Sequence, residues 1–412
     1  MRILFVGVLF DRSKEKEYLS MSKRGIPAAA NEFQWNVCDG LIEHTEHEMD
    51  ILTAIPVGYF PSKYKRGYLK KREWTYCGKR VKEIASINLP LIKQLQRKWN
   101  CYREVKKWIE EKPDENNLII VYSLYLPYLE AISKLIREYK YVQATLIITD
   151  LPGMYGILPE NQIKALVATI SGNRAMNVAR RFHTYVLLTE EMKTPLKIQN
   201  RPFVLIEGIC KSSNSNGHPK NKNQNDGKKY ILYTGTLHRI YGILDLVDAF
   251  EKITNDDCEL WICGTGDAED DIRKRSNPRI KLLGFCLKEQ VLEMQRNAQI
   301  LVNPRTSKGE YTKYSFPSKT IEYMESGVPV VMRRLPGIPD EYARYLVFTE
   351  DDSVEALQKC LAEVLKWSDR KREEYGLKAK EFVQRQKSPY KQTDKLILMA
   401  ERKFADSGID QK

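Results

Sequence analysis

The side chains with the clearest potential for chemistry lie in residues 314–331, where a Pro-Ser pair precedes a lysine, a threonine and a glutamate. This order predicts a short helix capped by Ser318, with Glu322 in its early turns. Free backbone amides at Ser318, Lys319 and Thr320, with the Lys319 ammonium, would form an anion site. Glu322 would accept hydrogen bonds from the two hydroxyls of a ribose, although the same pattern fits a capped surface helix with a solvated glutamate.

Two glycine turns precede this segment. Residues 230–250 predict a strand, a tight turn at Gly235 and an amphipathic helix, and Arg239 would offer positive charge to a phosphate there. Residues 260–266 predict a strand that ends in Gly-x-Gly before a helix. The third glycine of a dinucleotide fingerprint is missing, so we do not expect a dinucleotide cofactor.

Regular elements must hold these segments in position. Short apolar runs alternate with helical patterns along the chain, which predicts parallel sheets covered by helices. The first series of expected strands covers 3–10, 49–57, 118–123, 144–149, 185–189 and 203–206, and the second covers 230–234, 259–263, 280–283, 300–303, 328–332 and 346–349. Three helices are expected at 353–366, 370–386 and 390–404.

The two series define two domains. Residues 211–229 contain no aliphatic side chain and are rich in Ser, Asn, Lys and Gly, which indicates a linker. We therefore expect an α/β protein with two Rossmann-like parallel-sheet domains, 1–210 and 230–386, that face a central cleft. A final helix within 387–412 is expected to cross back to the first domain.

Charge is concentrated in one segment of this 412-residue chain, whose formal net charge is +13. Residues 63–112 hold sixteen Lys/Arg and five Asp/Glu, a local net charge of +11. From Leu91 onward, apolar residues recur at helical spacing. Basic amphipathic helices that contain Trp bind anionic membrane surfaces, which is the first interpretation. Single-stranded nucleic acid is the rival partner. The third interpretation is an ordinary core helix with a solvated basic face. The stripe consists of Ile92, Leu95, Trp99, Tyr102, and Trp108 or Ile109.

Metal and disulfide chemistry have little support in the sequence. The eight cysteines form no Cys-x-x-Cys pair, and no Asp-x-Asp occurs to hold a divalent ion. His44 and His47 lie among glutamates, and a solvated helix face is expected there rather than a metal site. The opening apolar run, 3–10, is too short to cross a bilayer, so a cytoplasmic protein is expected.

In their order along the chain, the motifs resemble the family 4 retaining glycosyltransferases of the GT-B fold. The second half carries this match in 233–237 with Gly242, 262–266, 280–285, 303–305 and 316–331. Three pieces of the first half, 148–152, 186–192 and 206–208, are similar to a branch that builds bacterial capsular polysaccharides or exopolysaccharides.

The resemblance implies residue roles. The family uses a Glu-x7-Glu motif whose second glutamate, Glu322 here, holds the donor ribose. The first position is Tyr314, so Glu310 is its candidate replacement. The family's phosphate-binding Arg and Lys fall on Thr236 and Tyr241.

The replacements we expect for those two cations are Arg239 and Lys319. The backbone near Phe285 and Cys286 would bind the base, and Asp150 would face the acceptor. The full set of expected nucleotide-sugar contacts is Gly235, Thr236, Arg239, Gly264, Phe285, Cys286, Tyr314, Ser318, Lys319, Thr320 and Glu322.

The function implied is transfer of a sugar from a nucleotide diphosphate, UDP in preference to GDP, to a glycan or polyprenyl-diphosphate-linked acceptor in surface polysaccharide synthesis. Catalysis would retain configuration and need no metal or cofactor, with Arg239 and Lys319 on the phosphate, Glu310 near the sugar and Asp150 orienting the acceptor. The enzyme would lie on the inner face of the cell membrane through 63–112 and would bind no nucleic acid. Two alternatives stay open, a sugar-nucleotide epimerase of the same fold and a non-catalytic subunit, the latter suggested by Tyr314.

Overall fold

The structure, a computed structural model, describes residues 1–23, 25–153, 162–211, 229–254 and 257–406. The chain divides into two compact units. Unit 1 comprises Met1–Ile209 and Pro389–Lys412, and unit 2 comprises Cys210–Ser388. Most of the expected linker, 212–228, lies outside the described residues.

Unit 1 is built on an eight-stranded sheet with the order β10-β9-β8-β7-β1-β2-β5-β4, parallel except for the antiparallel edge pair β5 and β4. The central strands are uniformly buried, as expected for a sheet covered on both faces. The strands are β1 Arg2–Gly7, β2 Glu48–Thr53, β4 Arg72–Tyr76, β5 Lys79–Glu83, β7 Asn117–Tyr122, β8 Gln143–Ile148, β9 Thr184–Leu187 and β10 Phe203–Leu205, and a separate pair joins β3 Tyr68–Leu69 to β6 Ser86–Ile87.

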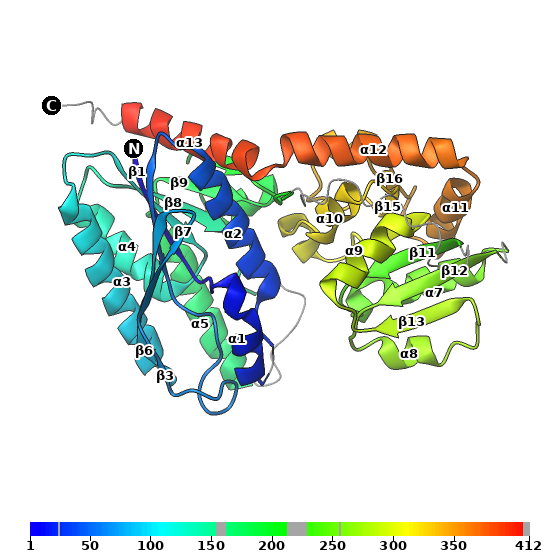
Figure 1. The fold of residues 1–412 in the computed structure, drawn as a ribbon, viewed down its shortest axis with the longest axis horizontal. Helices are drawn as coiled ribbons and strands as arrows, with labels where there is room; N and C mark the ends of the chain where they lie inside the picture. The colour runs from blue at the N-terminus through cyan, green and yellow to red at the C-terminus, as the bar shows by residue number, and fades with distance from the viewer. Residues whose placement is uncertain (24, 154–161, 212–228, 255–256, 407–412) are drawn as a thin grey trace. The chain divides into compact units, whose positions relative to one another are not determined.

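Helices cover both faces of this sheet. The helices α3 and α4 lie on one side and α2 on the other (Figure 1). The last helix, α13, packs against α2 and adds Leu396, Ile397 and Phe404 to the core that contains β1 and β7. The bounds are α1 Glu15–Met21, α2 Ala28–Glu43, α3 Ile92–Glu111, α4 Leu126–Glu138, α5 Gln162–Ala179, α6 Lys193–Leu196 and α13 Pro389–Asp406, with 3-10 turns at Arg12–Lys14 and Glu190–Met192.

Unit 2 holds an all-parallel sheet with the order β13-β12-β11-β14-β15-β16. One face packs against α7 and α11, and the other against α10 and α12. The strands are β11 Lys229–Thr234, β12 Cys258–Cys263, β13 Ile280–Gly284, β14 Ile300–Asn303, β15 Val330–Met332 and β16 Val347–Phe348. The helices are α7 Ile243–Glu251, α8 Glu269–Arg273, α9 Lys288–Asn297, α10 Lys319–Glu325, α11 Val354–Leu365 and α12 Asp369–Gln386, with 3-10 turns at Arg239–Tyr241, Glu310–Tyr314 and Asp340–Arg344.

The twelve expected strands and the three expected late helices are confirmed, with ends displaced by a few residues. The expected helix from Leu91 is also confirmed as α3, but its stripe does not lie on one face. Trp108 and Ile109 are buried, whereas Leu95 and Trp99 are exposed. The four strands between 68 and 87 were not expected. Charged and apolar residues alternate in β4 and β5 without a long apolar run, and β3 and β6 are only two residues long.

The expectation that His44 and His47 lie on a solvated helix face was wrong. His44 and His47 are both buried, because the end of α2 packs against α13 and His44 stacks on Tyr390. Within the described residues, no group of three or more His, Cys, Asp or Glu side chains gathers as a metal site would require. No helix in the described part of the chain combines the length and the apolar character needed to cross a membrane.

Candidate functional site

The order of the unit 2 sheet reverses between β11 and β14, so the carboxyl ends of these two strands diverge at Thr234 and Asn303. Parallel α/β sheets bind ligands at such a switch point, because the loops leave the neighbouring strands in opposite directions. The segments predicted to bind a ligand begin here, with Gly235 after β11 and residues 303–305 at the end of β14.

The turns after β11 and β12 pack backbone against backbone. Gly264 has a φ of 145°, and a Cβ atom on it would lie 1.8 Å from the carbonyl oxygen of Gly235. The amide of Gly235 donates to the carbonyl of Cys263, and that of Leu237 donates to Thr265. Glycine at position 264 is therefore required by close approach, and the two turns form one rigid floor.

Helix α10 is fixed to the end of β11 by Tyr323. The buried phenol accepts a hydrogen bond from the amide of Thr234 at 2.8 Å and donates to the carbonyl of the same residue at 2.9 Å. Burial raises the pKa of the Tyr323 phenol, so the hydroxyl stays protonated and keeps both bonds. These contacts hold the start of α10 beside the β11 turn.

The Glu322 carboxylate is oriented by two neighbours. Its Oε1 accepts hydrogen bonds from Gln295 Nε2 at 2.7 Å and from Lys319 Nζ at 2.8 Å. Gln295 also donates to Thr234 Oγ1 at 3.2 Å, which ties α9 to the same strand end. Both donors use Oε1, and Glu322 is only partly buried, so Oε2 is available to a ligand with paired hydroxyls.

Two details of the predicted anion site are wrong. Ser318 stands at the start of α10, but its side chain makes no capping hydrogen bond, since the residue itself has helical backbone angles. The amide of Thr320 is not free, because it donates to the carbonyl of Pro317 at 2.9 Å. A helix of seven residues also has a weak dipole. Side-chain cations must therefore supply most of the positive charge for an anion at this place.

Two arginines are candidates for that role. Arg239, which the sequence suggested, forms an ion pair with Asp271, and its amide donates to Asp267. Arg305, which we had not selected, follows β14 at the switch point and stacks on Tyr241 and Tyr311 at 5.3 and 4.8 Å. Its Nη2 donates to Ser315 Oγ, while its buried Nε has no hydrogen-bond partner among the described residues. The signal that would have found Arg305 is its place directly after a predicted strand.

The other expected contacts of the donor sugar lie in exposed turns. Glu310 begins a 3-10 turn, where its side chain is 76% exposed and 3.6 Å from Lys313. Tyr314 ends the same turn and is half-buried. Thr236 is exposed, and its carbonyl accepts from the Tyr233 hydroxyl. The structure does not connect Glu310 with Glu322 through any contact among the described residues.

Phe285 and Cys286 border a cavity of about 580 Å³ beside α9. Phe285 is exposed at the rim, and Trp261, which stacks on Tyr230, lies in the wall. Several residues of α9 line this cavity, and Gln295 of the same helix donates a hydrogen bond to the Glu322 carboxylate, which Lys319 also contacts. The cavity, the cation and the Glu322 carboxylate are thus neighbours, and a planar base, a diphosphate and a ribose have matching groups there. The remaining lining residues are Leu283, Gln290, Glu293, Met294 and Asn297.

Asp150 belongs to unit 1. It is exposed at the carboxyl end of β8, and its Oδ2 accepts a hydrogen bond from the Thr149 hydroxyl at 3.2 Å. That hydroxyl also lies 3.2 Å from the phenol of Tyr122, at the end of β7. The carboxylate is therefore held at the edge of the sheet where α/β proteins bind ligands.

Comparison with known proteins extends these observations. Residues 228–366, from β11 to the end of α11, match the family described as glycosyl transferases group 1. No curated protein matches the sequence.

Several solved structures share the fold along almost the whole chain. Sucrose-phosphate synthase from Thermosynechococcus elongatus is 14% identical with a TM-score of 0.62, covering 98% of this chain and 100% of that one. The UDP-forming α,α-trehalose-phosphate synthase from Burkholderia vietnamiensis is 11% identical with a TM-score of 0.62, covering 99% and 98%. The catalytic domain of starch synthase IV from Arabidopsis thaliana, bound to ADP and acarbose, is 8% identical with a TM-score of 0.64, covering 98% and 99%.

Likeness at such low identity shows the fold alone, and the expected GT-B fold is confirmed by it. The match of residues 228–366 to glycosyl transferases group 1 indicates the type of reaction. It falls on the unit that holds Glu322, Lys319 and Arg305. Together these findings support a glycosyltransferase of the GT-B fold whose second unit carries a glycosyl transferases group 1 domain.

Proposed function

We propose that the protein is a retaining, metal-independent glycosyltransferase that moves a sugar from a nucleotide diphosphate to a polyprenyl-diphosphate-linked glycan in surface polysaccharide synthesis. The observation that carries this proposal is the Glu322 carboxylate, which Gln295 and Lys319 orient at the switch point of the unit 2 sheet. UDP is the proposed nucleotide in preference to GDP, and a trehalose-phosphate synthase of the same fold is described as UDP-forming.

The proposed roles follow from where charge changes in the reaction. Negative charge grows on the departing phosphate, so fixed cations there stabilise the transition state more than the ground state. Lys319 and Arg305 supply this charge, and Arg239 joins them if it leaves Asp271. A phosphate oxygen takes the acceptor proton on the face from which the phosphate departs, which retains the anomeric configuration. Asp150 orients the acceptor, and Glu310 is assigned to the donor sugar.

The acceptor side of the proposal concerns unit 1. A lipid-linked acceptor lies at a membrane, and the basic segment 63–112 is proposed to face that anionic surface on the cytoplasmic side. Nucleic acid is not the proposed partner. Two aromatic residues of the segment that could have stacked on bases, Tyr64 and Trp108, are buried, and Trp108 Nε1 donates to Asp50.

The sharpest test of the donor site is Glu322→Gln. Because Gln295 and Lys319 are both donors, they hold the amide oxygen of the new side chain and turn its NH₂ group toward the ribose. One ribose hydroxyl then loses its acceptor. A hydrogen bond to a charged group contributes about 1.5–3 kcal/mol, so UDP affinity measured by calorimetric titration should fall by about tenfold or more.

Glu325→Gln is the matched control, since it removes the same charge from the same helix one turn later. Its UDP affinity should equal that of the wild type. Equal affinities of all three proteins for UDP, GDP and ADP would show that Glu322 does not hold the nucleotide. Product analysis with a panel of UDP-sugars then separates transfer from epimerisation, because an epimerase converts the donor sugar without an acceptor.

A further inference from the structure

The helix α3 presents its apolar side chains to solvent at its start. Leu91, Leu95 and Trp99 are 63 to 77% exposed. Leu91 also has a φ of 62°, a left-handed conformation that is costly for a residue with a Cβ atom. With Tyr68, the last two of these side chains border an open hollow of about 460 Å³. Of the nineteen large apolar side chains exposed among the described residues, six lie between Ile87 and Trp99.

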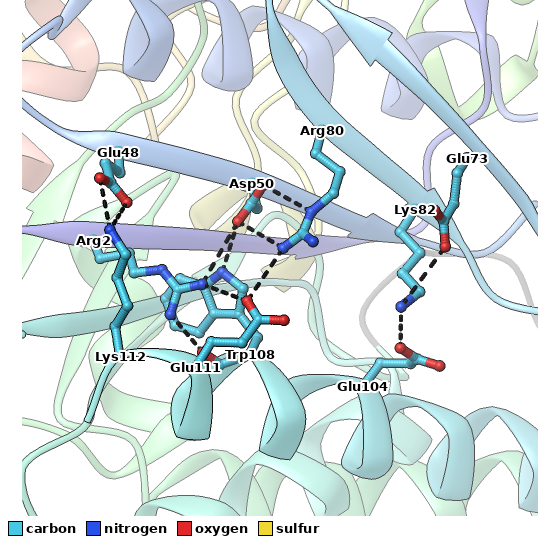
Figure 2. A network of polar contacts seen from close by, with 10 residues as sticks. All are labelled: Arg2, Glu48, Asp50, Glu73, Arg80, Lys82, Glu104, Trp108, Glu111 and Lys112. Carbon is cyan, nitrogen blue, oxygen red and sulfur yellow. Dashed lines mark hydrogen bonds and ion pairs between the residues drawn. The ribbon is translucent and has the colours of Figure 1, made fainter.

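Two cations at the start of α3 face the opposite way. Lys93 and Arg97 are buried and donate to the carbonyls of Val57 and Ile55. Several other cations of residues 63–112 are paired within unit 1. Figure 2 shows Arg80 with Asp50 and Glu111, Lys82 with Glu73 and Glu104, and Lys112 with Glu48. Of these acids, Asp50 and Glu48 lie outside residues 63–112, so they neutralise part of the net +11 charge counted in the sequence.

A second exposed apolar surface lies on α5. Leu166, Val167 and Ile170 are 59 to 61% exposed on the first half of this helix. A helix of a globular protein normally turns such residues toward a core. Three of them in two turns, with no partner among the described residues, indicate an interaction surface.

The two surfaces belong to one side of unit 1. Glu130, on α4, pairs with Lys98 of α3 at 2.6 Å and also with Arg174 of α5. The three helices are therefore neighbours. Their amino-terminal ends point to the end of unit 1 where β3 and β6 lie (Figure 1). This is the edge where the strands end and where Asp150 stands, since helices between parallel strands run opposite to them.

Cations that are not neutralised also occur at this end. Residues 63–71 hold five Lys or Arg and no acid, and all five are exposed. Buried Tyr64 and a backbone bridge to Ser22 fix this loop. Lys63 and Lys70 form no ion pair with any described residue.

We propose that this end of unit 1 docks on an anionic lipid bilayer, with Leu91, Leu95 and Trp99 of α3 and Leu166, Val167 and Ile170 of α5 inserted among the lipids. The loop 63–71 contacts the lipid headgroups. The charge of that loop selects an anionic membrane over a second copy of this basic chain. The inference deepens the proposed function, because a lipid-linked acceptor would then enter at the strand ends beside Asp150.

Flotation with phosphatidylcholine vesicles, with and without phosphatidylglycerol, tests the proposal. The full chain should float with the anionic vesicles, and high salt should weaken this binding. Leu95→Gln with Trp99→Gln, and separately Val167→Gln with Ile170→Gln, should each reduce partition by about tenfold or more. Leu377→Gln is the matched control, because Leu377 is 53% exposed on α12 of unit 2 and should leave flotation unchanged.

The contribution of the loop 63–71 is tested by a double variant and a matched control. Lys63→Gln with Lys70→Gln should weaken binding to anionic vesicles by about tenfold and leave the small binding to neutral vesicles unchanged. Lys274→Gln with Lys378→Gln removes the same charge from exposed positions of unit 2 and should have little effect. Leu91→Gln is a second α3 variant if the double variant fails to fold.

Three results would overturn the inference. They are a wild type that does not float, variants that float like the wild type, and a dimer that the α3 or α5 variants dissociate in the absence of vesicles. Calorimetric binding of UDP by the same preparations separates the two proposals. Intact UDP binding without flotation rejects only the docking surface, whereas flotation without UDP binding rejects only the donor site.

Discussion

At the scale of single residues, the ability of the candidate site to bind a ligand depends on which donors and acceptors already have hydrogen-bond partners within the protein. Gln295 and Lys319 both occupy Oε1 of Glu322, which leaves Oε2 for a ligand. Thr320 shows the reverse case, because its amide is already bonded to Pro317. A group can bind a ligand only where its hydrogen-bonding atoms are not already bonded within the protein. These partners are set by the fold and cannot be read from the sequence.

The phosphate cations should affect the reaction step more than nucleotide binding. Lys319→Ala and Arg305→Gln should each lower turnover of the preferred UDP-sugar by about 100-fold, while UDP affinity falls by less than about tenfold. The reason is that phosphate charge grows toward the transition state. Initial rates combined with UDP titration measure both quantities. A loss of UDP affinity with unchanged turnover would assign these cations to uniform binding instead.

Glu83 gives a prediction about pH. It is buried at the end of β5, neither of its oxygens has a hydrogen-bond partner among the described residues, and burial raises its pKa to about 7 despite the nearby Arg72 and Arg97. In the unfolded chain its pKa is about 4.3. The folded protein therefore holds the proton more tightly. The free energy of unfolding should decrease as pH rises from about 4.3 to 7 and then level off, with a total cost of about 4 kcal/mol.

Glu83→Gln removes this titration because the amide resembles the neutral acid. The variant should equal the wild type near pH 4 and exceed it in stability by up to about 4 kcal/mol at pH 8. Urea unfolding at a series of pH values measures the difference. If the two stability curves stay parallel, Glu83 has no shifted pKa.

At the scale of elements, the turns after β11 and β12 set the position of α10. Gly264→Ala would force a Cβ atom against the Gly235 carbonyl, and backbone cannot move aside as a flexible side chain does. We expect a loss of about 3 kcal/mol in the stability of unit 2, together with weaker UDP binding. Urea unfolding and UDP titration of the variant provide the two measurements.

Gly284→Ala is the comparison for this variant. Gly284 ends the neighbouring strand with a φ of 68°, but no atom lies within 4 Å of the added Cβ. Only the left-handed backbone is penalised, at about 1–2 kcal/mol. Equal losses for the two variants would mean that backbone conformation, rather than the contact with Gly235, makes Gly264 necessary.

Elements were more predictable than their contacts. The buried strands of both sheets could be predicted because short, continuous apolar runs between turn residues are typical of buried strands. The pair β4–β5 was missed because amphipathic strands that contain Lys and Arg resemble loops, and the pair β3–β6 was missed because each strand has only two residues. The position of Glu322 on an early helical turn was predictable from local spacing. Arg305 could have been selected from its place after a predicted strand, but its contacts with the rings of Tyr241 and Tyr311 could not be predicted from the sequence.

At the scale of the whole molecule, each unit has its own hydrophobic core. The core of unit 1 joins the two ends of the chain, since Leu396 on α13 packs with Ile3 on β1 in one buried cluster. In unit 2 the corresponding cluster contains Leu361 on α11 and Ile231 on β11. Separate cores predict that a defect in one unit leaves the local stability of the other unchanged.

The substitutions Leu396→Ala and Leu361→Ala test this independence as a matched pair, because both side chains are fully buried. Each removes the same atoms and should cost its own unit about 3 kcal/mol. Hydrogen exchange read by mass spectrometry should then become faster in β1 and α2 for Leu396→Ala, and in β11 and β14 for Leu361→Ala. Saturating UDP should slow exchange in unit 2 of both variants, because a ligand stabilises the unit that binds it. Faster exchange in both units from either substitution would mean that the two cores unfold as one cooperative structure.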